Sequence, residues 1–216
     1  MYVCMYVCAE GGGGERNRAN ALVAAVNANR TAARLPALRN SKGLGCMALQ
    51  YLAHCLTTAT QDTTTCGTDE LGSSCHPPER DVTEVYAANC GVELPTVDLI
   101  SARLLGCSFT HDDNDGSVLV TGANASSTVR GKEHTQVGAG LLRPRRHGPD
   151  FWCLLFSAGK PGTTFRLEAA GRGIVQPQGC FSDPDDALTC SIGSGKLQLL
   201  ASSMPLLLLP VLALGL

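Results

Sequence analysis

Apolar residues at helical spacing mark the first half of the chain. The segment 43–58 carries them at intervals of three and four, which form one continuous face: Leu44, Met47, Ala48, Tyr51, Leu52 and Cys55. This pattern predicts a core helix. The Ala-rich segment 20–33 has Leu22 and Val26 four residues apart and stops before Pro36, so it predicts a second helix.

Two further helices are predicted at 82–90 and 96–105. In the first, Val82, Val85 and Tyr86 are expected to face inward. In the second, the apolar residues at helical spacing are Val97, Ile100 and Leu104. The segment 61–78 is rich in Thr, Ser and Gly and predicts a loop crosslinked through its two cysteines, Cys66 and Cys75.

After Cys107 the pattern changes to short apolar runs separated by Gly, Pro and charged residues. The runs 117–121, 136–142 and 151–157 (SVLVT, QVGAGLL and FWCLLFS) predict strands. The basic stretch 143–147 (RPRRH) predicts a solvated turn. Helices in the N-terminal half and short antiparallel strands in the C-terminal half predict an α+β domain.

The two ends of the chain differ from this body. The start, MYVCMYVC, has neither helical nor strand periodicity and matches a translated ATGT repeat. We therefore interpret 1–15 as a gene-model artefact or a disordered segment, with the true signal peptide missing. We expect a cysteine-rich ectodomain at 16–178, a Cys-stapled stretch at 179–195, and a cleaved anchor signal at 196–216.

The C-terminal residues have the order of a glycosylphosphatidylinositol (GPI) signal: small residues, a moderately polar spacer, and an apolar block at 204–216. The attachment candidates are Ser191, Gly193 and Ser194. The alternative is a retained membrane span at 197–216, which has about the 20 residues required. That stretch contains Gln, Ser and Pro, and no basic residue follows it. We therefore expect the tail to be removed.

Cysteine is frequent, with 11 residues in 216. Setting aside Cys4 and Cys8, the remaining ones are Cys46, Cys55, Cys66, Cys75, Cys90, Cys107, Cys153, Cys180 and Cys190. This density predicts disulfides and an oxidising compartment. Zinc is disfavoured because no CxxC pair occurs. We expect a local bridge between Cys180 and Cys190, and, since the number is odd, Cys153 is either paired or a free thiol.

Two N-glycosylation sequons, at Asn29 and Asn124, agree with export. The formal net charge of −2 gives no reason to expect nucleic acid as a partner.

The order of these stretches (NALVAAVNANR, the segment ending YLAHC, TEVYAANC, QVGAGLL, DFWCLLFSAGKPGTTF and the anchor signal) resembles a plant family of uncharacterised GPI-anchored proteins. Their ectodomain is related to the CAP (SCP-like, pathogenesis-related) fold, and the resemblance implies an α-β-α sandwich. In CAP domains the opening helix ends with an Asn and an Arg, comparable to Asn29 and Arg30. The late glycine and cysteine strands are comparable to 138–140 and 153–162, and the resemblance implies a paired Cys153.

The chain differs from CAP domains at the residues of the central cleft that can hold a metal. The two His and two Glu of the central CAP cleft are missing, and we interpret His134 in EHTQ as a surface histidine at the start of a strand. The acidic stretch 112–116 lacks both end ligands of a calcium loop. The sequence therefore predicts no catalytic residue, no metal and no cofactor.

The sequence thus predicts a non-enzymatic, GPI-anchored glycoprotein on the outer face of a plant plasma membrane. It would bind a cell-wall component, a receptor ectodomain or a small apolar ligand. The first alternative is a cryptic secreted hydrolase that uses His54, His76 or His134. The second is a tail-anchored membrane protein on the cytosolic side, as the literal N-terminus requires.

Overall fold

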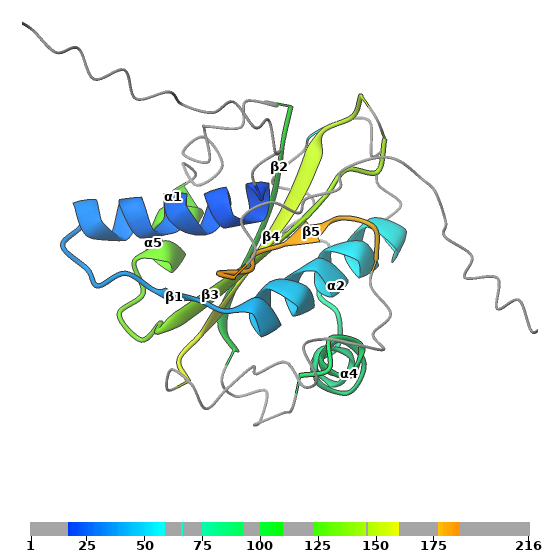
Figure 1. The fold of residues 1–216 in the computed structure, drawn as a ribbon, viewed down its shortest axis with the longest axis horizontal. Helices are drawn as coiled ribbons and strands as arrows, with labels where there is room; N and C mark the ends of the chain where they lie inside the picture. The colour runs from blue at the N-terminus through cyan, green and yellow to red at the C-terminus, as the bar shows by residue number, and fades with distance from the viewer. Residues whose placement is uncertain are drawn as a thin grey trace, which may run out of the picture.

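A mixed sheet with helices on both faces forms the body of the protein (Figure 1). The computed structural model describes residues 17–58, 66, 75–92, 100–109, 123–145, 147–159 and 177–185. The helices are α1 (Arg18–Ala32), α2 (Lys42–Thr58), the π-helix η1 (Asp81–Tyr86), α4 (Ala87–Asn89) and α5 (Ala123–Val129). The strands are β1 (Arg39–Asn40), β2 (Ile100–Ser108), β3 (Gln136–Leu142), β4 (Asp150–Ser157) and β5 (Cys180–Phe181).

The strands lie in the order β1-β3-β4-β2, and β5 pairs with β3 as well. The α+β prediction is confirmed, as are the helices at 20–33 and 43–58 and the strands at 136–142 and 151–157. The sheet is mixed, because β1 pairs with β3 in parallel while the other pairings are antiparallel. The helix α5 also lies in the C-terminal half, where only strands were expected.

The central strand β4 is buried on both faces, which explains its unbroken apolar sequence. Phe151, Cys153 and Leu155 belong to the cluster beneath α2. The alternate residues Trp152, Leu154 and Phe156 pack with α1 on the other face. Figure 1 shows the sheet nearly edge-on, with α1 and α5 on one side and α2 and α4 on the other.

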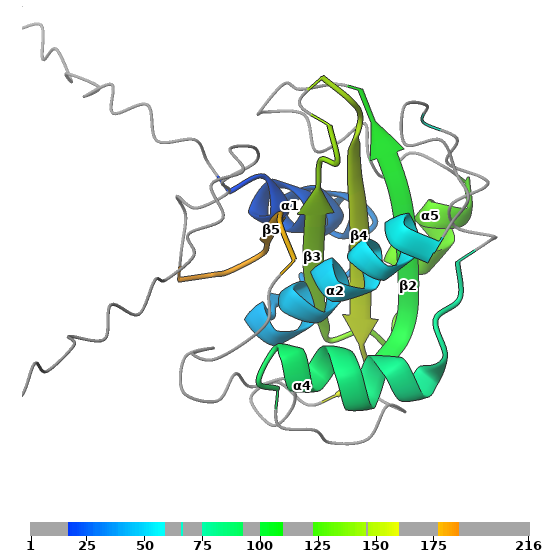
Figure 2. The ribbon, with the colours of Figure 1, turned by 90° about the vertical axis from the view of Figure 1, so that its right-hand side faces the viewer.

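The backbone of α2 lies directly on β3, and Figure 2 shows the helix crossing in front of β3 and β4. A Cβ atom at Gly138 would lie 2.1 Å from the backbone nitrogen of Gly45. One at Gly140 would lie 2.3 Å from that of Leu49. Only glycine leaves room for this approach.

The predicted helix at 96–105 is wrong over its described part, because Ile100 begins the nine-residue strand β2. The strand pairs with β4, and an irregularity in register falls between Ile100 and Ala102. Because of this irregularity, even-numbered residues on its two sides point to opposite faces of the sheet. Ile100 packs with the cluster beneath α2, whereas Leu104 packs with the cluster next to α1. The two residues whose spacing of four indicated a helix therefore face opposite ways.

The predicted helix at 82–90 is present as η1 and α4, but one of its residues faces outward. Val82 and Tyr86 are buried, as expected, whereas Val85 is 45% exposed. The reason is the wider turn of a π-helix, which rotates the i+3 residue away from the face that i and i+4 share.

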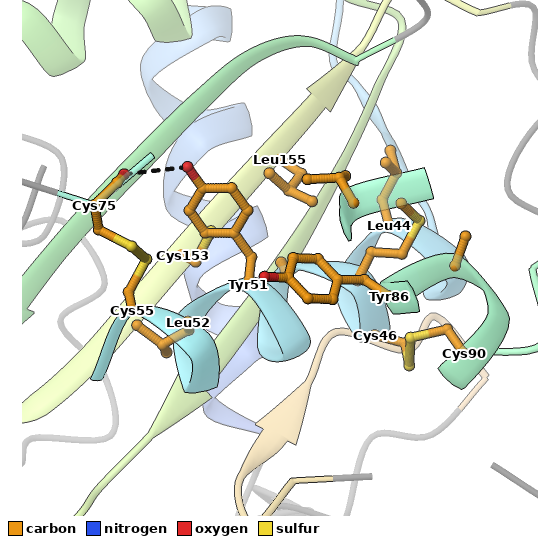
Figure 3. Packing of buried hydrophobic residues seen from close by; sticks show 14 of the residues in the cluster. Leu44, Cys46, Tyr51, Leu52, Cys55, Cys75, Tyr86, Cys90, Cys153 and Leu155 are labelled. Atoms are coloured by element: carbon orange, nitrogen blue, oxygen red, sulfur yellow. Dashed lines mark hydrogen bonds between the residues drawn. A yellow bond between two sulfur atoms is a disulfide. The ribbon is translucent and has the colours of Figure 1, made fainter. Parts of the chain in front are cut away.

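Three disulfides crosslink the α2 face of the sheet, and Figure 3 shows two of them, Cys46–Cys90 and Cys55–Cys75. They join Cys46 to Cys90, Cys55 to Cys75, and Cys66 to Cys107. The disulfide prediction is confirmed for these six cysteines. Cys180 is also disulfide-bonded, but Cys190 lies outside the described residues, so the Cys180–Cys190 bridge stays a prediction.

Cys153 is a free thiol with no exposed surface, so the pairing that the CAP resemblance implied is wrong. Burial raises the pKa of this thiol far above its ordinary value. It belongs to the same buried cluster as the three disulfides.

The segment that contains β5 is tied to the start of α1. The side-chain amide of Asn17 donates to the carbonyl of Phe181 at 3.0 Å, and Asn20 exchanges two hydrogen bonds with the backbone of Asp183. The ammonium of Lys42 lies 2.5 Å from a carboxylate oxygen of Asp183. The folded body therefore continues to at least residue 185.

Several predictions fall outside the described residues: the segment 1–15, the strand at 117–121, most of the loop at 61–78, and the tail from 186 onward. Within the part of the chain that is described, no helix is long and apolar enough to cross a membrane.

Replacing Cys46 and Cys90 together by Ala should lower the free energy of unfolding. The bridge closes a loop with a sequence separation of 44. The chain-entropy relation gives about 4 kcal/mol for such a loop, and the other bridges of the chain reduce this to roughly 2–4 kcal/mol. Urea unfolding followed by circular dichroism measures the change. Equal stability of the variant and the parent would contradict the contribution assigned to this bridge.

Replacing Gly138 or Gly140 by Ala should destabilise the protein by about 1–3 kcal/mol each, because the added methyl group overlaps the backbone of α2. The shift in the urea midpoint at constant slope measures this cost. A midpoint unchanged in both variants would mean that α2 does not lie as close to β3 as described.

Candidate functional site

His134 is the centre of a hydrogen-bonded group between β2, α5 and β3. Its Nδ1 lies 2.7 Å from the Oγ of Ser101, and its Nε2 lies 2.9 Å from the carbonyl oxygen of Thr128. The residue is only 3% exposed, so its interpretation as a surface histidine is wrong. The ring turns inward and packs on Phe156, with 4.9 Å between ring centroids.

The two neighbours of His134 fix its protonation. The carbonyl of Thr128 only accepts hydrogen bonds, so Nε2 carries the proton. The neutral ring then has its lone pair on Nδ1, which accepts the hydroxyl proton of Ser101. The Ser101 hydroxyl thus donates to the basic nitrogen Nδ1, and the hydrogen bond at the other ring nitrogen, Nε2, fixes the orientation of the ring.

Ser101 reaches the histidine from the irregular end of β2. It lies where the register with β4 shifts, between Ile100 and Ala102. Bulges re-aim side chains and are frequent beside active sites. Ser101 itself is partly exposed, whereas its partner His134 is buried.

Arg30 supports the same region from α1. Its side chain is fully buried, with Nε donating to the carbonyl of Pro36 at 2.9 Å. Nη1 donates to the carbonyls of Val129 and Gly131 at 2.7 and 2.8 Å. Arg30 and His134 thus satisfy carbonyls at and after the C-terminus of α5, which has unpaired acceptors and a partial negative charge. The remaining nitrogen, Nη2, has no hydrogen-bond partner among the described residues.

The pKa of His134 is below its ordinary value. Burial is the main cause, since it disfavours the charged ring, and the nearby cation of Arg30 acts in the same direction. The carboxylate of Glu133, 3.7 Å from Nε2, and the carbonyl of Thr128 oppose the change. The ring is therefore held neutral.

The three histidines named for a cryptic hydrolase do not come together. His54 lies on α2, with its ring centroid 6.0 Å from that of Tyr86, in the layer on the opposite face of the sheet from His134. His76 is exposed and follows Cys75 directly. Among the described residues, no group of three His, Cys, Asp or Glu is placed to hold a metal ion.

A second polar group lies on the α2 face. The hydroxyl of Tyr51 donates to the carbonyl of Cys75 at 3.3 Å, and the guanidinium of Arg103 lies over its ring at 5.7 Å from the centroid. Figure 3 shows Tyr51 and Tyr86 between two disulfides. The hydroxyl of Tyr86 is buried and has no partner in the described part of the chain. These contacts fasten the disulfide-bonded segment to α2.

Asp150 is a buried carboxylate between two guanidiniums. Arg143 binds it at 2.6 and 2.9 Å, and Arg18 lies 2.5 Å away. Burial alone would raise its pKa, but the two cations outweigh burial and hold the pKa below the ordinary value. The interpretation of RPRRH as a solvated turn holds for Pro144, Arg145 and His147, which are exposed between β3 and β4, but not for Arg143, which is partly buried against Asp150.

The predicted modification sites are only partly within the described residues. Asn29 lies on α1, partly buried, where its Oδ1 accepts from the Nε of Arg130 at 3.3 Å. Asn124 lies in α5, but its side chain is not among the described parts of the structure. Ser191, Gly193 and Ser194 lie outside the described residues.

Comparison with known proteins does not establish a family. No family model matches the chain, and no curated protein matches it. A cysteine-rich secretory protein from Staphylococcus aureus has a TM-score of 0.38 at 12% identity, over 65% of this chain and 38% of its own. An outer surface protein from Borrelia burgdorferi has a TM-score of 0.40 at 12% identity, over 63% and 89%.

This chain spans about two fifths of the length of the staphylococcal protein. A TM-score below 0.5 does not establish a common fold. The CAP-like ectodomain and the plant GPI-anchored family therefore stay predictions.

Because His134 is buried in its neutral form, acid should destabilise the fold. The unfolded chain takes up a proton near pH 6.5, and the folded state does so only at lower pH. The free energy of unfolding should therefore fall as the pH drops from about 7 through 6.5, until the lower pKa of the folded state is reached.

Urea unfolding between pH 8 and pH 4.5 measures this dependence. His134→Gln should remove part of the slope below about pH 7. Identical slopes in the parent and the variant would show that His134 does not titrate as described.

Proposed function

We propose that this protein is an extracellular, non-enzymatic binding module, with a CAP-like ectodomain, held on the outer face of a plant plasma membrane by a GPI anchor. The observation that carries the proposal is the set of three disulfides in one buried cluster. Such bonds persist in oxidising compartments and are rare where glutathione keeps thiols reduced.

The disulfides support an extracellular location because the segments that they join include the core helix of the fold. Cys46 and Cys55 lie on the core helix α2, and their partners fasten the region around η1 to it. The third bridge connects Cys66 to Cys107 in the strand β2. The three bridges close loops with sequence separations of 44, 20 and 41. In a reduced chain these loops would no longer be closed, and their stabilising effect would be lost. Function in a reducing cytosol is therefore disfavoured.

The anchor is supported by the sequence of the tail, where small residues and a spacer precede an apolar block. The sequons at Asn29 and Asn124 agree with passage through the secretory pathway. Attachment at Ser191, Gly193 or Ser194 would leave only a few residues between the folded body and the lipid.

Binding is proposed over turnover because the charged clusters of the described residues are used within the fold. Asp150 pairs with two arginines, and Arg30 holds the carbonyls that follow α5. We propose a cell-wall component or a receptor ectodomain as the partner. The helices on both faces of a mixed sheet agree with the sandwich that a CAP-like ectodomain requires.

Phospholipase treatment tests the anchor and the location together. The chain is expressed behind a secretion signal in plant cells, and the intact cells are treated with phosphatidylinositol-specific phospholipase C. We expect release of a glycosylated protein in which the cysteines of the three described bridges resist alkylation without prior reduction. A variant that ends at residue 203 should appear in the medium without phospholipase.

Two failures have different meanings. A protein that is reached by antibody on intact cells but is not released would contradict the anchor alone. A protein with reactive thiols at Cys46 and Cys55 and no glycan would contradict the extracellular placement, and with it the whole proposal.

A further inference from the structure

We propose that Ser101 is a nucleophile activated by His134, and that it accepts an acyl group from small carboxylic esters. The observation is the 2.7 Å hydrogen bond from the Ser101 hydroxyl to His134 Nδ1, with Nε2 held by the carbonyl of Thr128. This site does not depend on the anchor or on a binding partner. Failure of one proposal would therefore leave the other untouched.

The geometry supplies three parts of an activated nucleophile: a hydroxyl, a base within hydrogen-bond reach, and a third group that orients the base. Here the third group is a backbone carbonyl at the C-terminal end of α5, which fixes the Nε2–H tautomer. Phe156 packs against the ring, and Gly131 lies so close that a Cβ there would be 2.5 Å from Nε2. The base is thus held rigidly by packing as well as by hydrogen bonds.

Access to the serine comes from its place in the sheet. Among the described strands, β2 stands at the end of the order and pairs with β4 on one side. Ser101 lies at the register shift of this strand and is partly exposed, while the base behind it is shielded from water.

The reaction balances with these two residues and the ester alone. The Oγ of Ser101 forms a bond to the ester carbonyl carbon, and its proton moves to Nδ1 of His134. The tetrahedral adduct then breaks its bond to the leaving alkoxide, which takes that proton and departs as an alcohol. The products are acyl-Ser101, the alcohol and a neutral His134.

Charge around the ring sets the pH range of this step. The imidazolium that forms is favoured by the carboxylate of Glu133 at 3.7 Å from Nε2 and by the carbonyl of Thr128 from α5. It is opposed by burial and by Arg30 from α1, while Ser101 from β2 and Phe156 from β4 carry no charge. The same balance lowers the pKa of His134, so the base stays neutral in mildly acidic solution.

The pair supplies a nucleophile and a base, and donors for the oxyanion are a separate requirement of turnover. The expected reaction is therefore the transfer of one acyl group per chain, with slow release. This agrees with a protein whose main role is binding.

The test uses the full chain, secreted and oxidised, with p-nitrophenyl acetate and an alkyl fluorophosphonate as probes. We expect a burst of one p-nitrophenol per chain, and peptide mass spectrometry should place both the acetyl and the phosphonyl group on Ser101. Ser101→Ala should abolish both adducts. His134→Gln should slow phosphonylation at least about 100-fold, the contribution typical of a positioned base.

Ser108→Ala is the matched control, because this serine lies at the other end of the same strand and should label no differently from the parent. Circular dichroism and the urea midpoint show whether each variant is folded. The pH profile of the parent gives a second measurement that needs no variant: the rate should fall in acid with one ionisation below pH 6.5.

Labelling at another residue, no labelling of the parent, or equal rates in the parent and a folded His134→Gln variant would each overturn the proposal. Loss of the adduct in Ser101→Ala together with slow labelling in His134→Gln would support it.

Discussion

The close contact between α2 and β3 is the constraint on which most of the structure depends. Gly138 and Gly140 leave no side chain between helix and strand, so the helix axis is set by backbone against backbone. Once α2 is placed in this way, Cys46 and Cys55 face the segments that they crosslink. The same contact buries one face of β4, with Cys153 at its centre. The strand can therefore be apolar throughout.

The other face of the sheet combines the disulfide-bonded Cys180 with several buried polar groups. Arg30 and His134 each donate to carbonyls at or just after the C-terminus of α5, and a seven-residue helix has little stability of its own. The cost of burying a guanidinium is offset by its three hydrogen bonds to carbonyls. The three described bridges crosslink the α2 face, whereas on the α1 face Arg30 and His134 hydrogen-bond the carbonyls at the end of α5.

The sequence predicted the elements whose periodicity is strong and local. The core helix at 43–58 and the strands at 136–142 and 151–157 follow from apolar spacing, and the structure has them within a residue or two. The strand β2 was missed because a bulge breaks its alternation, and because pairing with β4, which no local pattern records, decides its conformation. The prediction that Val85 faces inward was wrong because the sequence does not indicate that this segment forms a π-helix, which is wider than an α-helix.

The candidate site was harder to predict, because its residues come from β2, α5 and the loop before β3. One signal was present: Arg30 continues the stripe of Leu22 and Val26 at intervals of four, and a cation on an apolar face must be buried with partners. Nothing comparable marked Ser101. Its importance comes from the strand register, which only the fold reveals.

The free thiol of Cys153 has a consequence for how the chain acquires and keeps its crosslinks. A thiolate can attack a neighbouring disulfide and exchange partners with it, and three disulfides share its cluster. Its burial beneath α2 suppresses that attack, since the thiol is both inaccessible and held protonated. The native pairing is thus kept by a kinetic barrier, namely the opening of the core. A folding chain must pack α2 over β4 before oxidation is complete, or shuffle its bonds into the wrong pairs.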